Sequence, residues 1–215
     1  MTDQEKYDNI FKANKEWIEK NKKDNPKLFD LLAAEQHPEF LYIGCSDSRV
    51  HPNQIMGLKP GEVFIHRNIA NMVNSTDLNA LSVINYAVET LKVKFIIICG
   101  HYECGGVRAA MEHKDFGMLN PWLCSIRDVY NLHKLELNAI SDKEQRYRRL
   151  IEINTYEQCR NVMKLAEVQR SYYNNGYPKV AGWVFDIKDA KLHDLNFDFV
   201  GELEQIKEVY DITGE

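Results

Sequence analysis

Two short motifs carry residue types that bind metal ions and activate water. The first is Cys45–Arg49, a C-x-D-x-R pattern, and the second is His101–Gly106, an H-x-x-C pattern followed by two glycines. Two thiols and one imidazole are ligands that Zn²⁺ prefers. Three protein ligands leave the fourth tetrahedral position open, as in catalytic zinc sites. The two motifs therefore predict that Cys45, His101 and Cys104 bind one zinc ion.

Each motif has a simpler interpretation when it is taken alone. A cysteine at the end of a strand is usually a packing residue, and a single histidine usually satisfies a hydrogen bond. A phosphatase-like nucleophile is the natural alternative for Cys45, but that chemistry needs a longer phosphate-binding loop than the three residues that separate Cys45 from Arg49. The metal site is favoured because both motifs occur at predicted strand ends.

Apolar runs and helical spacing indicate the elements that must position these motifs. Strands are expected at 40–44, 63–66, 94–99 and 179–187, with 191–197 as a hairpin partner. Helices are expected in the first thirty residues and at 77–91, from 104 or 105 onwards, at 122–132 and at 142–173. Strands that alternate with helices predict an α/β fold with a mainly parallel sheet. Sites in such sheets lie beyond the carboxyl ends of the strands, where both motifs stand.

Composition and charge exclude several classes of partner. The longest unbroken apolar run is Phe95–Cys99, far short of the ~20 residues that span a membrane. The first twenty-five residues contain no apolar stretch typical of a secretory signal. The net charge of −5 resides in 198–215, which we interpret as a solvated helix, so residues 1–197 are electrically balanced. This pattern argues against binding of nucleic acid or of an anionic membrane surface.

Five cysteines without a secretory signal do not suggest a disulfide framework. Thiols that stay reduced are typical of the cytoplasm, which is the compartment that we expect. Cys99, Cys124 and Cys159 have no partner at metal-ligand spacing and are interpreted as core or surface thiols.

Four segments of the sequence resemble β-class carbonic anhydrases. They are Cys45–Val50, Pro60–Glu62, His66–Asn71 and Cys99–Gly106, and the likeness runs from about Gln36 to Ile187. The resemblance implies a zinc enzyme that interconverts CO₂ and bicarbonate. It also implies a mainly parallel sheet with a flanking antiparallel strand and helices on its faces, and a homodimer or dimer of dimers. In that arrangement residues 1–35 form a helical arm that embraces a neighbour, and residues 36–215 form the catalytic domain.

The resemblance also assigns roles to individual residues. The three predicted ligands match the zinc ligands of the family, and Asp47 and Arg49 match its carboxylate–guanidinium dyad. Asp47 then either accepts a hydrogen bond from zinc-bound water or replaces that water as fourth ligand in a closed state. Gln36 matches the amide that orients the substrate oxygen. Chemically, zinc makes hydroxide available near neutral pH for attack on CO₂, and Arg49 can hold Asp47 ionised through a bidentate pair.

Two other functions remain open at this stage. The same fold and ligands can support a zinc hydrolase of carbon disulfide or carbonyl sulfide, or a non-catalytic protein that binds zinc or bicarbonate. The intact pair of Asp47 and Arg49 argues against the non-catalytic alternative, since a purely structural site does not need it. The sequence also departs from family members gated by bicarbonate. Arg67 is retained from their effector pocket, but Tyr42 and Phe185 stand where those members have tryptophan and tyrosine.

Overall fold

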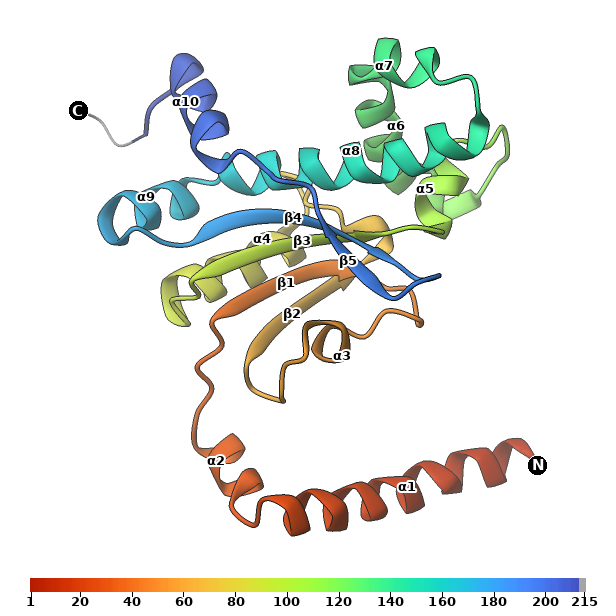
Figure 1. Cartoon of the computed structure of the whole chain (residues 1–215), viewed down its shortest axis with the longest axis vertical. Coiled ribbons are helices and arrows are strands. Elements are labelled where there is room, and N and C mark those ends of the chain that lie inside the picture. Colours follow the sequence, from red (N-terminus) through yellow and green to blue (C-terminus); the bar gives the residue numbers. More distant parts are fainter. Residues whose placement is uncertain (213–215) are drawn as a thin grey trace. The chain divides into compact units, whose positions relative to one another are not determined.

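A five-stranded sheet lies at the centre of the chain (Figure 1). The computed structural model describes residues 1–212, and its strands follow the order β2-β1-β3-β4-β5. The strands are β1 (Phe40–Cys45), β2 (Val63–Asn68), β3 (Phe95–His101), β4 (Lys179–Asp186) and β5 (Lys191–Asp194). Neighbouring strands pair in parallel except for β4 and β5, which form an antiparallel hairpin. The predicted α/β fold with one antiparallel flanking strand is therefore confirmed.

Helices and short turns connect the strands. The helices are α1 (Asp3–Asp24), α2 (Leu28–Ala34), α3 (Pro52–Met56), α4 (Leu78–Asn85), α5 (Gly105–Ala110), α6 (Asn120–Leu132), α7 (Lys134–Ala139), α8 (Lys143–Met163), α9 (Ala166–Asn175) and α10 (Phe199–Val209). Single turns lie at Ile69–Asn71, at Gly117–Leu119 and at Tyr86–Thr90, which continues α4. Within residues 1–212, no helix combines the length and the apolar character that crossing a membrane requires.

The two faces of the sheet are covered unequally. Alternate residues of β1 and β3, such as Leu41 and Ile96, pack in one core cluster with the apolar sides of α4, α8 and α9. The residues between them, such as Tyr42 and Ile97, face the short helix α3 and the β4–β5 hairpin. Because both faces are buried, the central strands consist of continuous apolar runs, as parallel strands do.

The region predicted as one helix over 142–173 is interrupted, and this part of the prediction is wrong. The helix α8 ends at Met163, and the backbone of Leu165 is extended before α9 begins. The amide of Gln169 donates to the carbonyl oxygen of Met163 at 2.8 Å, which satisfies an acceptor that the broken helix leaves free. No glycine or proline marks this break, so the sequence carries no local signal for it. The helices α3 and α7 were also not predicted.

The acidic C-terminal segment forms α10, but one of its faces is not solvated. Glu202 and Leu203 are buried against the rest of the fold. The carboxylate of Glu202 accepts hydrogen bonds from Arg160 Nε at 2.7 Å, Arg160 Nη2 at 2.8 Å and the hydroxyl of Tyr156 at 2.9 Å. The expectation of a fully solvated helix is therefore corrected. Glu215, the last acid of this segment, lies outside the described residues.

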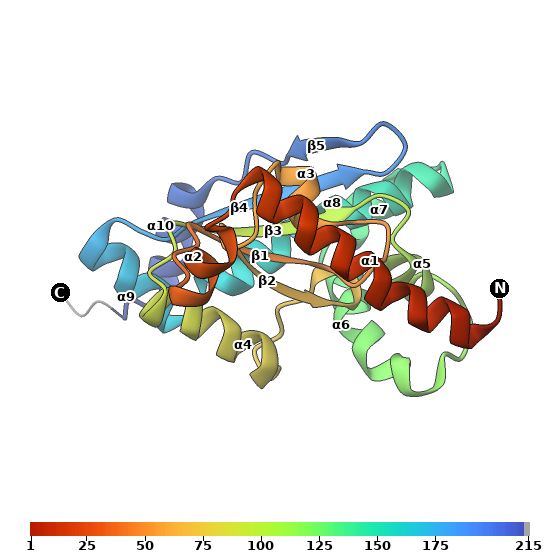
Figure 2. The ribbon, with the colours of Figure 1, turned by 90° about the horizontal axis from the view of Figure 1, so that it is seen from below.

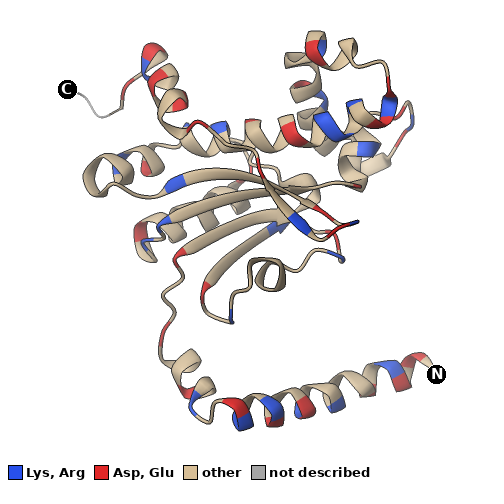
Figure 3. Ribbon diagram, viewed as in Figure 1, with Lys and Arg blue, Asp and Glu red and all other residues tan. Residues whose placement is uncertain are grey.

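Residues 1–36 form a compact unit of their own, and the second unit begins at His37. Thr2 and Glu5 cap the start of α1 reciprocally, and Trp17 packs edge-on against Phe29 at 5.4 Å between ring centroids. Both charge signs are distributed along α1, and α2 folds beside its end (Figures 2 and 3). Neither helix buries a residue, although Tyr7, Ile10, Phe11 and Trp17 are large and exposed. This unit therefore presents apolar surface that its own helices do not cover.

Candidate metal centre

The predicted ligands come together at the carboxyl ends of two neighbouring parallel strands. Cys45 is the last residue of β1 and His101 is the last residue of β3. Gly44 of β1 pairs with Cys99 of β3 in the sheet. Cys45 lies one residue after Gly44, and His101 lies two residues after Cys99, so the two ligands are close together. Cys104 follows in the turn after β3 and caps the start of α5. The sulfur atoms and an imidazole nitrogen of the three residues lie within 4.8 Å of one another.

The donor set and its spacing fit a tetrahedral zinc ion. The two sulfur atoms are 3.9 Å apart. Zinc–sulfur bonds of ~2.3 Å at a tetrahedral angle separate two sulfurs by about 3.8 Å. The hydrogen bond from the Cys104 thiol lowers the pKa of Cys45 to about 4, whereas the same contact and burial raise the pKa of Cys104. One of the two thiols is thus prepared to act as a thiolate, the form that binds a metal.

The imidazole of His101 is oriented for the same role. Its Nδ1 lies 2.9 Å from the carbonyl oxygen of Tyr102, which places the proton on that nitrogen. Its Nε2 is buried and has no hydrogen-bond partner in the described chain. A buried ring nitrogen that has no hydrogen-bond partner destabilises the fold unless another group binds it. Because two cysteine thiols lie beside Nε2, the group that fits this position is a metal ion bound by all three side chains.

Asp47 and Arg49 form the predicted pair beside these ligands. Arg49 donates from Nε to Oδ1 of Asp47 at 2.9 Å and from Nη2 to Oδ2 at 2.7 Å, while its backbone N–H also reaches Oδ1. These bonds hold the pKa of Asp47 well below its usual range. Oδ2 of Asp47 is 3.8 Å from Nε2 of His101, so the ionised carboxylate borders the position that the ligands surround.

Three further residues support this loop region, and one of them, Glu103, lies between two predicted ligands in the second motif. Arg67 donates to the backbone carbonyl oxygens of Cys45 at 2.9 Å and Asp47 at 2.5 Å. Glu103 adopts a left-handed backbone with φ of 63°, and its carbonyl oxygen accepts from Arg49 at 3.2 Å. Tyr147, on α8, donates to the carbonyl oxygen of Cys104 at 2.8 Å. Only the tertiary fold brings the side chains of Arg67 and Tyr147 to the ligand loops.

Three residues named from the sequence remain, Gln36, Tyr42 and Phe185. Gln36 is exposed at the end of the first unit, and its role toward the substrate stays a prediction. Tyr42 and Phe185 are buried in the cluster that faces α3 and the β4–β5 hairpin. Burial raises the pKa of Tyr42, which stays neutral. Both side chains therefore act as core packing residues in this structure.

A second group of possible ligands lies at the β4–β5 hairpin. It consists of Asp186, Asp189 and His193. Both carboxylates already have cationic partners, since Arg148 lies 2.9 Å from Asp186 and Lys191 lies 3.2 Å from Asp189. The group is accordingly a turn stabilised by ion pairs rather than a match for the buried centre.

Comparison with known proteins identifies the family. A family model described as "Carbonic anhydrase" matches residues 40–192. A carbonic anhydrase of Emericella nidulans is 58% identical over 207 residues, which cover 96% of this chain and 91% of that protein. The chain belongs to the β-carbonic anhydrase family. Its membership makes the chain an enzyme of the carbonic anhydrase type.

Solved structures agree with this family in fold. The β-carbonic anhydrase CafA of Aspergillus fumigatus is 37% identical, with a TM-score of 0.89 over 96% of this chain and 99% of that chain. One of two tetrameric β-carbonic anhydrases from Sordaria macrospora is also 37% identical, with a TM-score of 0.85 over 89% of this chain and 98% of that one. The resemblance inferred from the four motif segments is therefore confirmed.

Proposed function

We propose that this β-carbonic anhydrase is a zinc enzyme that catalyses the reversible hydration of CO₂ to bicarbonate and a proton. The observation that carries the proposal is the gathering of two thiol sulfurs and a buried, unpartnered imidazole nitrogen beside an ionised carboxylate. Cys45, His101 and Cys104 would hold the metal. When it is bound, zinc supplies a Lewis acid that makes hydroxide available from water near neutral pH.

Asp47 and Arg49 would orient the nucleophile. The carboxylate of Asp47 is only 15% exposed and borders the ligands, so it can accept a hydrogen bond from a water at that position. Arg49 keeps this carboxylate ionised and holds both of its oxygens. In this proposal, Gln36 would direct its amide toward the substrate oxygen, as its match to the family motif implies.

The same pair would also control access to the metal. Asp47 is close enough to compete as a fourth ligand, and the bidentate bond to Arg49 opposes that movement. We expect Arg49→Ala to place the carboxylate on zinc and to lower turnover even at alkaline pH, while Arg170→Ala leaves both unchanged. Zinc-edge absorption spectroscopy from acid to alkaline pH reads the fourth ligand directly. A water ligand in Arg49→Ala at every pH would refute this role for Asp47.

The active species would be a homodimer or a dimer of dimers. The exposed apolar side chains of α1 offer an arm for a second copy, and the Sordaria relative is described as tetrameric. We also propose a reducing compartment such as the cytoplasm, because all five cysteines are unpaired and two of them are needed as thiolates.

A stopped-flow assay of CO₂ hydration on protein of measured metal content tests the function. We expect one zinc per chain, and we expect Cys104→Ser to lose both zinc and turnover. Cys124→Ser is the matched control, because Cys124 is exposed on α6 and no ligand. Rapid turnover of carbon disulfide or carbonyl sulfide without CO₂ hydration would favour the related hydrolase. Zinc without turnover of any of these substrates would favour the non-catalytic alternative.

A further inference from the structure

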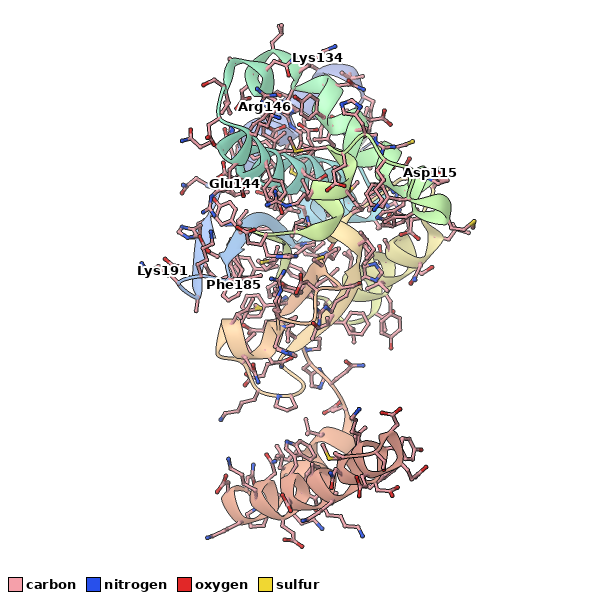
Figure 4. The ribbon with its side chains drawn as sticks, turned by 90° about the vertical axis from the view of Figure 1, so that its right-hand side faces the viewer. Asp115, Lys134, Glu144, Arg146, Phe185 and Lys191 are labelled. Carbon is pink, nitrogen blue, oxygen red and sulfur yellow. The ribbon has the colours of Figure 1, made fainter. Side chains whose placement is uncertain are left out.

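A cavity of about 880 Å³ opens between α5, α6 and the start of α8, separate from the metal centre. None of Cys45, His101 and Cys104 lines it. Figure 4 labels Glu144 and Arg146, two of the cavity's lining residues, which lie near the start of α8. The volume falls within the range of small-molecule sites, which is ~300–1,000 Å³.

The cavity combines an apolar lining with a strong excess of positive charge. Its apolar part includes Met111, Ile126, Tyr130 and Leu150. The charged lining residues are five basic and two acidic ones, namely Arg108, Lys114, Arg127, Lys143, Arg146, Glu112 and Glu144. An excess of cations in a concave surface with apolar walls concentrates anions there.

Two of these cations are half-buried and lack a counter-charge. Arg127 donates from Nε to the carbonyl oxygen of Ala110 at 3.1 Å. Arg146 donates from Nε at 2.9 Å and from Nη2 at 2.6 Å to the carbonyl oxygen of Ile140. Within residues 1–212, neither guanidinium has a carboxylate partner. Partly desolvated charges without a counter-charge are costly, so an anion that reaches them is stabilised.

The acidic residues of the lining do not cancel this excess. Glu144 is engaged by Arg108, which holds its two oxygens at 3.1 and 3.2 Å. Lys143 is exposed and has no ion pair among the described residues. Glu112 is the remaining acidic residue of the lining, and its single negative charge compares with four positive charges from two arginines and two lysines. The charge balance of the cavity therefore calls for an anion from outside the chain.

We propose that this cavity binds a small organic anion, with Arg127 and Arg146 holding a carboxylate or phosphate group and the apolar lining holding a hydrophobic body. The planar guanidinium fork matches the oxygen geometry of both anionic groups. Nη1 and Nη2 of Arg127 and Nη1 of Arg146 make no hydrogen bond within residues 1–212, so they are free to donate. None of the three predicted zinc ligands lines the cavity, although Arg108 and Tyr147 line it and also contact the turn that carries Cys104.

Calorimetric titration of the full-length, metal-loaded protein with three probes tests the site. Phenyl phosphate and 3-phenylpropionate carry the two candidate anionic groups on an apolar body, and inorganic phosphate lacks the body. We expect at least one aromatic probe to bind at least about tenfold more tightly than inorganic phosphate, and the stronger of the two identifies the anionic group. Failure of both aromatic probes to bind, or equal binding of inorganic phosphate, overturns the proposal.

Substitutions then locate the binding. We expect Arg127→Gln and Arg146→Gln each to weaken the aromatic probe at least about tenfold, because each removes charge-assisted hydrogen bonds. Arg170→Gln makes the same charge change on the exposed side of α9 and should not alter the affinity. If the probe binds at the metal centre instead, its affinity for the two cavity variants will equal its affinity for the parent protein. That result would refute binding in the cavity.

The two arginine variants also lose hydrogen bonds to backbone carbonyl oxygens, and this loss could unfold the protein. A third variant, at a residue without such bonds, therefore completes the test. Lys143→Gln changes an exposed side chain that makes no hydrogen bond within the described chain. We expect it to weaken the aromatic probe severalfold with an unchanged melting temperature. Affinity equal to that of the parent in this folded variant would contradict the predicted anion site. Tyr147 and Arg108 are left intact throughout, because both also contact the turn that carries Cys104.

Discussion

Gly100 directly precedes the ligand His101, and the structure predicts that a single methyl group at this position disturbs both stability and metal binding. A Cβ on Gly100 would overlap Oγ1 of Thr155 on α8, roughly 1 Å inside van der Waals contact. It would also lie 3.4 Å from Cγ2 of Ile151. Thr155 is fully buried, and its hydroxyl donates to the carbonyl oxygen of Ile151 at 2.9 Å. Neither partner can therefore move aside easily.

The expected cost follows from this confinement. Overpacking of a core typically costs ~1–3 kcal/mol, and we place Gly100→Ala at about 2 kcal/mol because β3 is paired on both sides. For a chain of this size, that corresponds to roughly 4–8 °C in melting temperature. His101 must shift with the strand, whereas metal–ligand distances tolerate only ~0.2 Å. We expect Gly100→Ala to lose zinc at chelator concentrations that the parent withstands.

Urea unfolding and zinc retention, measured at equal protein concentration, check this reasoning. The double variant Gly100→Ala/Thr155→Ala removes the overlapping hydroxyl, so it should be at least about 1 kcal/mol more stable than the sum of the two single losses predicts. Gly105→Ala is the matched control on the other side of the ligand turn, because a Cβ there meets open space. Parent-like stability and zinc retention in Gly100→Ala, or strict additivity in the double variant, would refute the steric explanation.

Three further predictions concern the arm and two ion pairs. Removal of residues 1–25 should dissociate or aggregate the protein in sedimentation experiments, and an unchanged, stable dimer would contradict the proposed role of the arm. Glu202→Gln should cost about 2 kcal/mol in urea unfolding because a buried carboxylate loses its charge beside an arginine, while the exposed control Glu204→Gln should cost little. Arg148 lowers the pKa of Asp186, so the ionised carboxylate stabilises the fold above its ordinary pKa and that contribution fades as the pH falls below about 4. Asp186→Asn should therefore lose up to about 1 kcal/mol at pH 7 and less at pH 3.5, and a loss independent of pH would count against the pair.

The amino-acid sequence by itself determined the strands, most of the helices and the chemistry of the candidate site. Continuous apolar runs that end at the C-x-D-x-R and H-x-x-C motifs specify buried strands with ligands at their ends. Parallel pairing of β1 with β3 then places Cys45 and His101 at one edge of the sheet, because the carboxyl ends of parallel strands meet there. Asp47 and Arg49 are also within reach of sequence reasoning, since two residues separated by one position in a turn can form a local pair.

Only the tertiary structure decided which distant residues support that site. Arg67 and Tyr147 donate to backbone carbonyl oxygens of the ligand loops, and such contacts leave no pattern in the sequence because any residue offers a carbonyl group. The burial of Glu202 likewise depends on the packing of α10 beside α8. The acidic composition of the segment predicts a solvated helix instead, so the sequence does not indicate this burial. The unpaired charge of Arg127 and Arg146 is visible only in the fold, because a sequence shows which charges exist but not which of them find partners.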